Sequence, residues 1–314
     1  MPTDSPVRSL IGQILSTFEN ANPATASMLR QAVAAGSINP ELELDCVAGA
    51  PRTPYISGNP PTITLHITHL EMLWAFIYGM FVLYEHEMRE AMLHQRLPVS
   101  DPAYSEAVRL RAGNLLVWSK SLRNDYTQWP TDAPSPMVYL PEEKQLSEKV
   151  NNLFLSTAAL MLHHEYCHAT QRHMAPNRTS EEILEQEKEA DDFAHHQFLD
   201  AASTELDKRK LGWSVLILPL SCLYLVSGPL GLFQSRHPHI HHRIGAALSR
   251  LNFMEDGNQD YFNGLCIAAV TTYMVEHGLL DRDFRNDPDL KKQFERASDA
   301  LTYFYDHLDM LRVA

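Results

Sequence analysis

Residues 162–168 contain the pattern H-E-x-x-H, whose two histidines and glutamate can form one site when the segment is helical. On a helix, His164 and His168 stand four residues apart, so both imidazoles project from one face and can hold one metal ion. Glu165 lies beside that face, within reach of a water molecule bound there. Two imidazoles and an adjacent carboxylate base are typical of zinc hydrolases. The pattern therefore predicts a helix that carries a zinc-dependent catalytic centre.

The residues before the motif favour a buried helix over the simpler interpretation, a helix with two surface histidines. Apolar side chains precede the motif at Phe154, Ala158, Ala159, Leu160 and Leu162. We expect this helix to begin near Glu142 and to end near His173. His163 should face away from the metal, roughly 100° around the helix from His164. Cys167 should pack as a small apolar residue.

A zinc site needs a third protein ligand, and the next predicted helix, 179–200, offers several acids. In its pattern E-x-x-A-D, Glu187 and Asp191 stand four apart on one face, and the small Ala190 would let two helices approach closely. We expect Glu187 to bind zinc and Asp191 to accept a hydrogen bond from a ligand histidine, fixing its tautomer. A solvated acidic face is the alternative. Competing ligands are Glu185, Asp191, Asp192, His195 and His196.

A third pattern, H-P-x-x-x-x-R, starts at His237 in a histidine-rich stretch, 237–242. Pro238 suits the first turn of a helix. His237 would then lie at the N-terminus of that helix and donate a hydrogen bond to the oxyanion that develops on the scissile carbonyl. Arg243 could pair with a carboxylate such as Asp191. The alternative is a histidine-rich turn or a weak, adventitious metal tract.

Composition restricts partners and compartment. The formal net charge is -13 and the sequence pI is about 5.6, which argues against nucleic acid as a partner and mildly against anionic lipid. The N-terminus has no basic stretch followed by an apolar core, so we expect no signal peptide. We expect a cytoplasmic protein with reduced thiols, because its cysteines form no C-x-x-C pair: Cys46, Cys167, Cys222 and Cys266.

The remaining patterns predict a mainly α chain with a small β-hairpin or sheet, an α+β fold. Two short helices within 6–35 precede strands over 41–47 and 62–67, which could pair as a hairpin and bind substrate by strand addition. A capping box at Thr68 and Glu71 should start the next helix. Further helices are expected at 68–96, 102–123, 209–227, 239–252, 259–278 and 287–309. We expect one metallopeptidase domain over 1–314: N-terminal helices and strands over 1–67, a catalytic core over 68–252, and C-terminal helices over 253–314.

Residues 211–233 hold no charged side chain, which meets the length of a membrane span. Glycines, prolines and serines interrupt this segment, so a buried central helix is favoured. A membrane segment, and with it association with the inner membrane, stays open as the alternative.

The three motifs in this order resemble the gluzincin pattern of the HtpX and CAAX-prenyl protease families, and more closely the Lit-type phage-exclusion metallopeptidases. The resemblance lies in five stretches: 70–76, with Trp74-Ala75-Phe76, 129–140, 162–168, 187–191 and 237–244. The ends of the chain and the histidine-rich segment 239–242 depart from the Lit-type pattern.

The resemblance implies a zincin-like core built on the H-E-x-x-H and E-x-x-A-D helices. By position, His164, His168 and Glu187 would bind Zn²⁺ and Glu165 would be the base. It also implies a protein substrate, elongation factor Tu, cleaved when a phage capsid peptide is present, so that infection aborts. Two other classes remain: a membrane-associated quality-control protease of the HtpX type, and a non-catalytic binding module stabilised by its metal.

Overall fold

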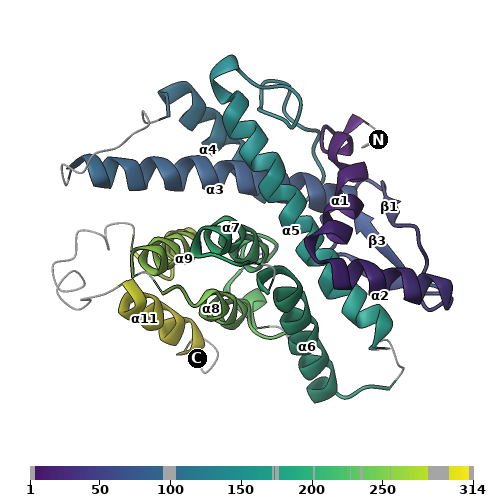
Figure 1. The fold of residues 1–314 in the computed structure, drawn as a ribbon. Helices are drawn as coiled ribbons and strands as arrows, with labels where there is room; N and C mark the ends of the chain where they lie inside the picture. The colour runs from purple at the N-terminus through teal and green to yellow at the C-terminus, as the bar shows by residue number, and fades with distance from the viewer. Residues whose placement is uncertain are drawn as a thin grey trace. The chain divides into compact units, whose positions relative to one another are not determined.

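The structure is a computed structural model, which describes residues 4–94, 104–171, 173, 177–200, 202–226, 228–233, 236–254, 256–281 and 297–310. It is mainly helical with one three-stranded sheet, which confirms the α+β class (Figure 1). Contacts divide the chain into two compact units, Met1–Glu165 and Tyr166–Ala314. The boundary falls inside one continuous helix, α5 (Lys144–Thr170). The single domain and the zincin-like core stay predictions.

The first unit opens with the two predicted short helices, α1 (Arg8–Ala21) and α2 (Pro23–Ala34). α1 buries one apolar stripe at helical spacing, formed by Leu10, Ile14 and Phe18. Asn22 ends the first helix and caps the second, because its side chain accepts a hydrogen bond of 2.9 Å from the Ala24 N–H. Pro23 occupies the first turn of α2, where its missing N–H costs nothing.

The sheet contains β1 (Glu43–Asp45), β2 (Tyr55–Ser57) and β3 (Thr62–His66) in the order β1-β3-β2. The predicted strands 41–47 and 62–67 correspond to β1 and β3. Their predicted pairing as a hairpin is wrong, because β1 and β3 pair in parallel. Parallel neighbours need a crossover connection, and part of that connection forms β2, antiparallel to β3. Gly58, at φ +83°, makes the tight turn between β2 and β3.

α3 (Ile67–His94) follows β3 without a loop, so the predicted capping box at Thr68 is wrong. Thr68 and Glu71 are instead buried inside the first turns, and burial raises the pKa of Glu71 to about 7. Residues 95–96 of this predicted helix lie outside the described residues. α4 (Glu106–Ser121) packs tightly on α3 at Gly79, where a Cβ would lie 2.8 Å from the Leu116 Cβ.

A short 3-10 turn, η2 (Pro141–Glu143), leads into α5 and fixes its start in the first unit. Glu143 is fully buried, where it accepts hydrogen bonds from the Tyr78 hydroxyl (2.9 Å) and the Leu140 N–H (2.7 Å). Arg111 lies 3.2 Å from the same carboxylate. A buried carboxylate with a cation and two donors is well satisfied, so the helix that carries the H-E-x-x-H pattern is held firmly at its N-terminus.

The second unit holds α6 (Ser180–Leu199), α7 (Glu205–Cys222), the 3-10 turn η3 (Pro229–Leu232), α8 (Ile240–Leu251), α9 (Asp256–Glu276) and α11 (Ala297–Met310). Thr179 and Glu182 form a capping box at the start of α6. α7 and α9 approach closely at Gly212, where a Cβ would lie 2.7 Å from the Phe262 ring. Residues 287–296 of the last predicted helix lie outside the described residues.

Among the described residues, one helix is long and apolar enough to cross a membrane, α3 over Ile67–His86. Of that apolar window, 89% is buried, as in the core helix of a globular unit. The uncharged segment 211–233 is divided between the end of α7 and η3. Its helical part, including Trp213 and Leu216, is largely buried, in keeping with the favoured buried helix.

Candidate metal centre

Three histidines and a cysteine in this part of α5 lie in two different environments. His164 and His168 are 8% and 7% exposed. His163 is fully buried in the first unit, with its ring centroid 4.3 Å from that of Phe18, and burial lowers its pKa to about 3. Cys167 is also buried, and burial raises the pKa of its thiol to about 12. Both residues lie where the sequence predicts them, away from any metal role.

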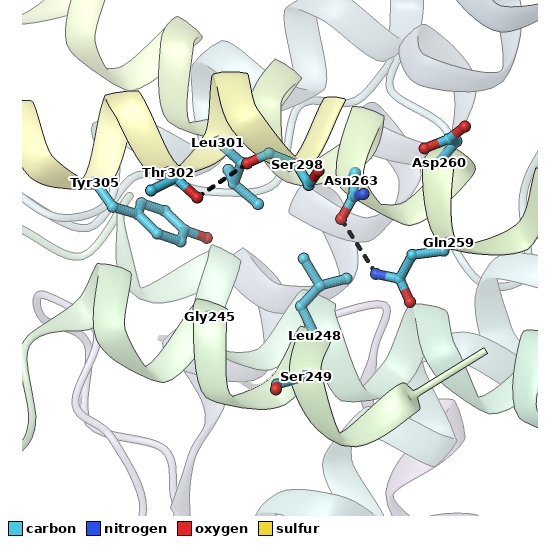
Figure 2. A pocket seen from close by; sticks show the side chains of 10 residues that line it. All are labelled: Gly245, Leu248, Ser249, Gln259, Asp260, Asn263, Ser298, Leu301, Thr302 and Tyr305. Atoms are coloured by element: carbon cyan, nitrogen blue, oxygen red, sulfur yellow. Dashed lines mark hydrogen bonds between the residues drawn. The ribbon is translucent and has the colours of Figure 1, made fainter. Parts of the chain in front are cut away.

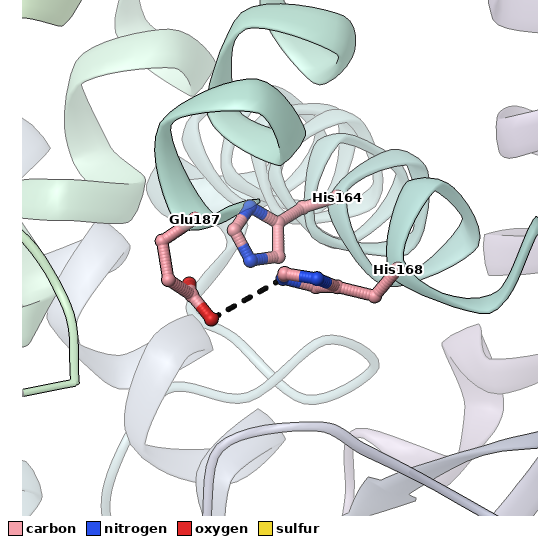
Figure 3. Close-up of side chains that lie close together, drawn as sticks. All are labelled: His164, His168 and Glu187. Atoms are coloured by element: carbon pink, nitrogen blue, oxygen red, sulfur yellow. Dashed lines mark ion pairs between the residues drawn. The ribbon is translucent and has the colours of Figure 1, made fainter. Parts of the chain in front are cut away.

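Glu187 of α6 is the acid that the structure brings to the motif histidines. Its Oε1 lies 3.3 Å from the His168 Nε2, and its side chain is 12% exposed. Figure 3 shows the side chains of His164, His168 and Glu187 turned toward one another. One donor atom of each lies within 4.8 Å of the other two. Ala190, on the same helix, has no exposed surface, as expected of the residue that lets this helix pack closely.

The spacing of these donors suits a zinc ion. Zinc binds histidine nitrogen and carboxylate oxygen at about 2.0–2.2 Å, so two ligands at the tetrahedral angle are roughly 3.3–3.5 Å apart. The His168–Glu187 separation of 3.3 Å matches that edge. Three donors of this kind leave a fourth tetrahedral position for water, as in catalytic rather than structural zinc sites. His164, His168 and Glu187 therefore fit the predicted ion.

Two contacts behind His168 favour one of its tautomers. Its Nδ1 lies 3.0 Å from the Nδ1 of His173, and the His173 Nε2 lies 3.4 Å from a carboxylate oxygen of Glu189. The Glu189 carboxylate favours a proton on the His173 Nε2, which leaves the His173 Nδ1 to accept a hydrogen bond from the His168 Nδ1. The His168 Nε2 then presents a lone pair toward Glu187, which is the state a metal ligand requires. Burial lowers the pKa of His173, which favours this neutral form.

His237 lies against Glu187, where the sequence predicts an oxyanion donor. Its Nδ1 donates to the Glu187 Oε2 over 2.7 Å, and its side chain is 42% exposed. Each oxygen of Glu187 thus faces one imidazole, His168 on one side and His237 on the other. The contact holds the carboxylate in place, and a neutral ring that donates from Nδ1 has no second N–H for an oxyanion.

Asp191 and Arg243 form the predicted ion pair, in a bidentate arrangement. The Arg243 Nε and Nη2 donate to the two Asp191 oxygens over 2.9 and 2.7 Å, and the side chains are 16% and 15% exposed. The pair links α6 to α8. Whether Asp191 also accepts a hydrogen bond from a ligand histidine stays a prediction.

The competing ligands have other partners. Glu185 is 76% exposed beside Lys188, and Arg250 contacts both Asp192 and His195. His196 is 70% exposed and lies 3.6 Å from Asp200.

Glu165 is half-buried on α5, next to His164. His173 and Glu189 were missed, because His173 follows the end of α5 without a motif and Glu189 resembles a solvated surface acid.

The motif helix, the acid from the following helix and the supporting ion pair define a candidate metal-dependent hydrolase centre in a mainly helical chain. The chain belongs to the Peptidase U49 family, whose model matches residues 63–266. It is 28% identical over 230 residues to the Cell death peptidase of Escherichia coli (strain K12), covering 71% of this chain and 72% of the relative. No solved structure matches the chain significantly. The family assignment makes this chain a peptidase, and a peptidase acts on a protein or peptide substrate.

Proposed function

We propose that this peptidase is a zinc-dependent endopeptidase in which His164, His168 and Glu187 hold Zn²⁺. Bound zinc would supply Lewis acidity for a peptide carbonyl and would lower the pKa of water to about 7. The observation that carries the proposal is the convergence of His164, His168 and Glu187, each with one donor atom within 4.8 Å of the others. The 3.3 Å between the His168 Nε2 and the Glu187 Oε1 is the spacing of two ligands on one zinc ion.

Glu165 is the proposed general base. It removes a proton from the attacking water and delivers it to the leaving amine, so one carboxylate serves both halves of the reaction. Its half-buried position lets it reach water while the two ligand histidines beside it stay buried.

His237 positions Glu187 through its Nδ1–H and would stabilise an oxyanion only as an imidazolium, which can donate from both nitrogens. The Asp191–Arg243 pair holds α6 against α8, which keeps Glu187 and His237 in register.

The proposed substrate is a host protein, elongation factor Tu or a similar factor, and the proposed trigger is a phage peptide. Support comes from the relative, whose name is Cell death peptidase, and from the Lit-type motifs. In this proposal the enzyme is cytoplasmic, stays inactive in uninfected cells, and aborts infection by cleaving a factor on which translation depends.

The direct test combines metal analysis with a digest of elongation factor Tu, with and without a phage capsid peptide. We expect about one zinc per chain at this centre, and cleavage that requires the peptide and stops with a chelator. Glu187→Gln should lose the ion and the activity, whereas Glu185→Gln, a matched change of an exposed acid on α6, should lose neither.

Each contrary result points to a defined alternative. Zinc that is retained by Glu187→Gln excludes this ligand set. Tight zinc in a parent that cleaves nothing would favour a metal-stabilised binding module. Partition of the parent into membranes without detergent would favour an enzyme of the HtpX type that uses 211–233 as its membrane segment.

A further inference from the structure

A second group of metal donors lies in the second unit, apart from Glu187 and its partners. Its members are His241 and His242, at the start of α8, and Asp309, near the end of α11. One donor atom of each lies within a common 4.8 Å. These histidines belong to the segment 239–242, which departs from the Lit-type pattern and which the proposed peptidase mechanism does not use.

The Asp309 carboxylate faces both imidazoles at once. Its Oδ1 lies 2.8 Å from the His241 Nε2, and its Oδ2 lies 3.0 Å from the His242 Nε2. Side chains of adjacent helix residues project about 100° apart. The His241 and His242 rings reach one carboxylate because the Nε2 atom of each points toward α11. His239 adds a third imidazole to the same turn, with its ring centroid 5.3 Å from that of His242.

The environments of the three donors suit metal binding. His241 is fully buried, whereas His242 and Asp309 are 50% and 44% exposed, which leaves a route for an ion from solvent. Two imidazole nitrogens and a carboxylate oxygen make up a zinc set, whereas Ca²⁺ and Mg²⁺ prefer sites made of oxygen ligands alone.

We propose that His241, His242 and Asp309 form a second zinc site with three protein ligands, which holds the C-terminal helix α11 against α8. Coordination of the ion would replace the two hydrogen bonds to Asp309: each ring would bind through Nε2 as a neutral imidazole protonated at Nδ1, and any proton in excess would leave to solvent. Because α8 also carries Arg243, next to His242, the site stabilises the helix whose arginine binds Asp191 of α6.

Pinning α11 has a structural consequence, because this helix forms one wall of a cavity of about 620 Å³. Figure 2 shows the cavity between α8, α9 and α11, with Tyr305 and Gly245 on facing helices. The Tyr305 ring centroid lies 6.0 Å from that of His241, so one side chain touches both the cavity and the zinc site. A Cβ at Gly245 would lie 3.3 Å from the Tyr305 ring, which shows how closely the helices pack there. Release of the ion should therefore loosen this wall.

The test counts zinc in the full-length protein after metal stripping and titration with Zn²⁺ alone. If both sites exist, the parent binds two equivalents, and a His164→Ala/His168→Ala variant keeps one. Asp309→Asn or His242→Ala should weaken the remaining equivalent by at least tenfold. Asp306→Asn is the matched control, since it makes the same change at an exposed acid one turn earlier on α11.

Hydrogen exchange provides a second measurement that does not depend on the double variant folding. Zinc should slow amide exchange along α11 in the parent and in Asp306→Asn, and should have no such effect in Asp309→Asn. The proposal is overturned if Asp309→Asn keeps full zinc affinity, or if zinc leaves α11 exchange unchanged in the parent. A parent that binds one equivalent, lost in Asp309→Asn but not in the His164→Ala/His168→Ala variant, would reject the proposed catalytic centre and support this site.

Discussion

The two donor clusters use the same residue types but differ in what surrounds them. In the first, His164 and His168 share a helix face four residues apart, and the carboxylate comes from α6. In the second, His241 and His242 are adjacent, and Asp309 alone brings them together from α11. The i, i+4 spacing gives convergence through helix geometry, whereas adjacent histidines converge only through a tertiary contact.

The supporting residues differ as well. One carboxylate oxygen of Glu187 accepts a hydrogen bond from His237, and the Nδ1 of His168 is hydrogen-bonded to His173. Asp309 contacts one histidine with each of its oxygens, and within the described residues the buried Nδ1 of His241 has no hydrogen-bond partner to orient the ring. The first cluster also has a carboxylate, Glu165, next to a ligand. A His-His-carboxylate set therefore indicates a metal, but a base and a supporting shell indicate catalysis.

The largest expected effect comes from removing the base. Glu165→Gln should lower the rate of peptide hydrolysis by about 10²–10⁴-fold, because it removes proton transfer, while zinc content at the first cluster stays unchanged. Cleavage assays and metal analysis on one preparation test both halves. Glu148→Gln is the control, as an exposed glutamate on the same helix. Parent-like cleavage by Glu165→Gln would end the distinction between the clusters.

The ion pair that joins α6 to α8 links the two clusters, so breaking it tests whether they are independent. Asp191→Asn leaves Arg243 mostly buried without its counter-charge, and should lower the free energy of unfolding by about 3–5 kcal/mol. Denaturant titration followed by Trp213 fluorescence measures this in the second unit. Asp200→Asn, in an exposed pair, should change stability by less than about 1 kcal/mol. Equal effects of the two changes would contradict the structural role of the pair.

The sequence predicted what depends on local spacing. The order of the helices followed from apolar periodicity and from the breaks between segments, and the convergence of His164 and His168 followed from their spacing. The parallel pairing of β1 with β3 depends on contacts between distant segments, which no local pattern encodes. For the same reason neither the meeting of Asp309 with two histidines nor that of His237 with Glu187 was expected.

A smaller effect should follow from removing the support behind His168. His173→Phe keeps a ring of similar shape but cannot accept from the His168 Nδ1, so zinc affinity at the first cluster should fall about 10–100-fold. Competition with a chromophoric chelator measures the change. His307→Phe, on α11, is the control. His173→Gln, which can accept through its amide oxygen, should recover part of the affinity, and a failure to do so would assign His173 to packing alone.

The smallest effect concerns His163, which differs from its neighbour His164 in burial and role. Its pKa is about 3 in the folded protein, below the ordinary value of about 6.5, because burial disfavours the charged ring. The unfolded chain therefore binds the extra proton first. The stability that neutral His163 contributes is complete above about pH 6.5 and is lost as the pH falls toward 3, by at most about 1.4 kcal/mol per pH unit.

His163→Leu should flatten this slope in urea titrations of the first unit between pH 7 and 5, leaving the part due to buried His69, whose pKa is lowered to about 4. His196→Leu, at an exposed site, should leave the slope unchanged. An unchanged slope in His163→Leu would mean that His163 is protonated in the folded state, and the contrast between the buried histidine and the two metal clusters would fail there.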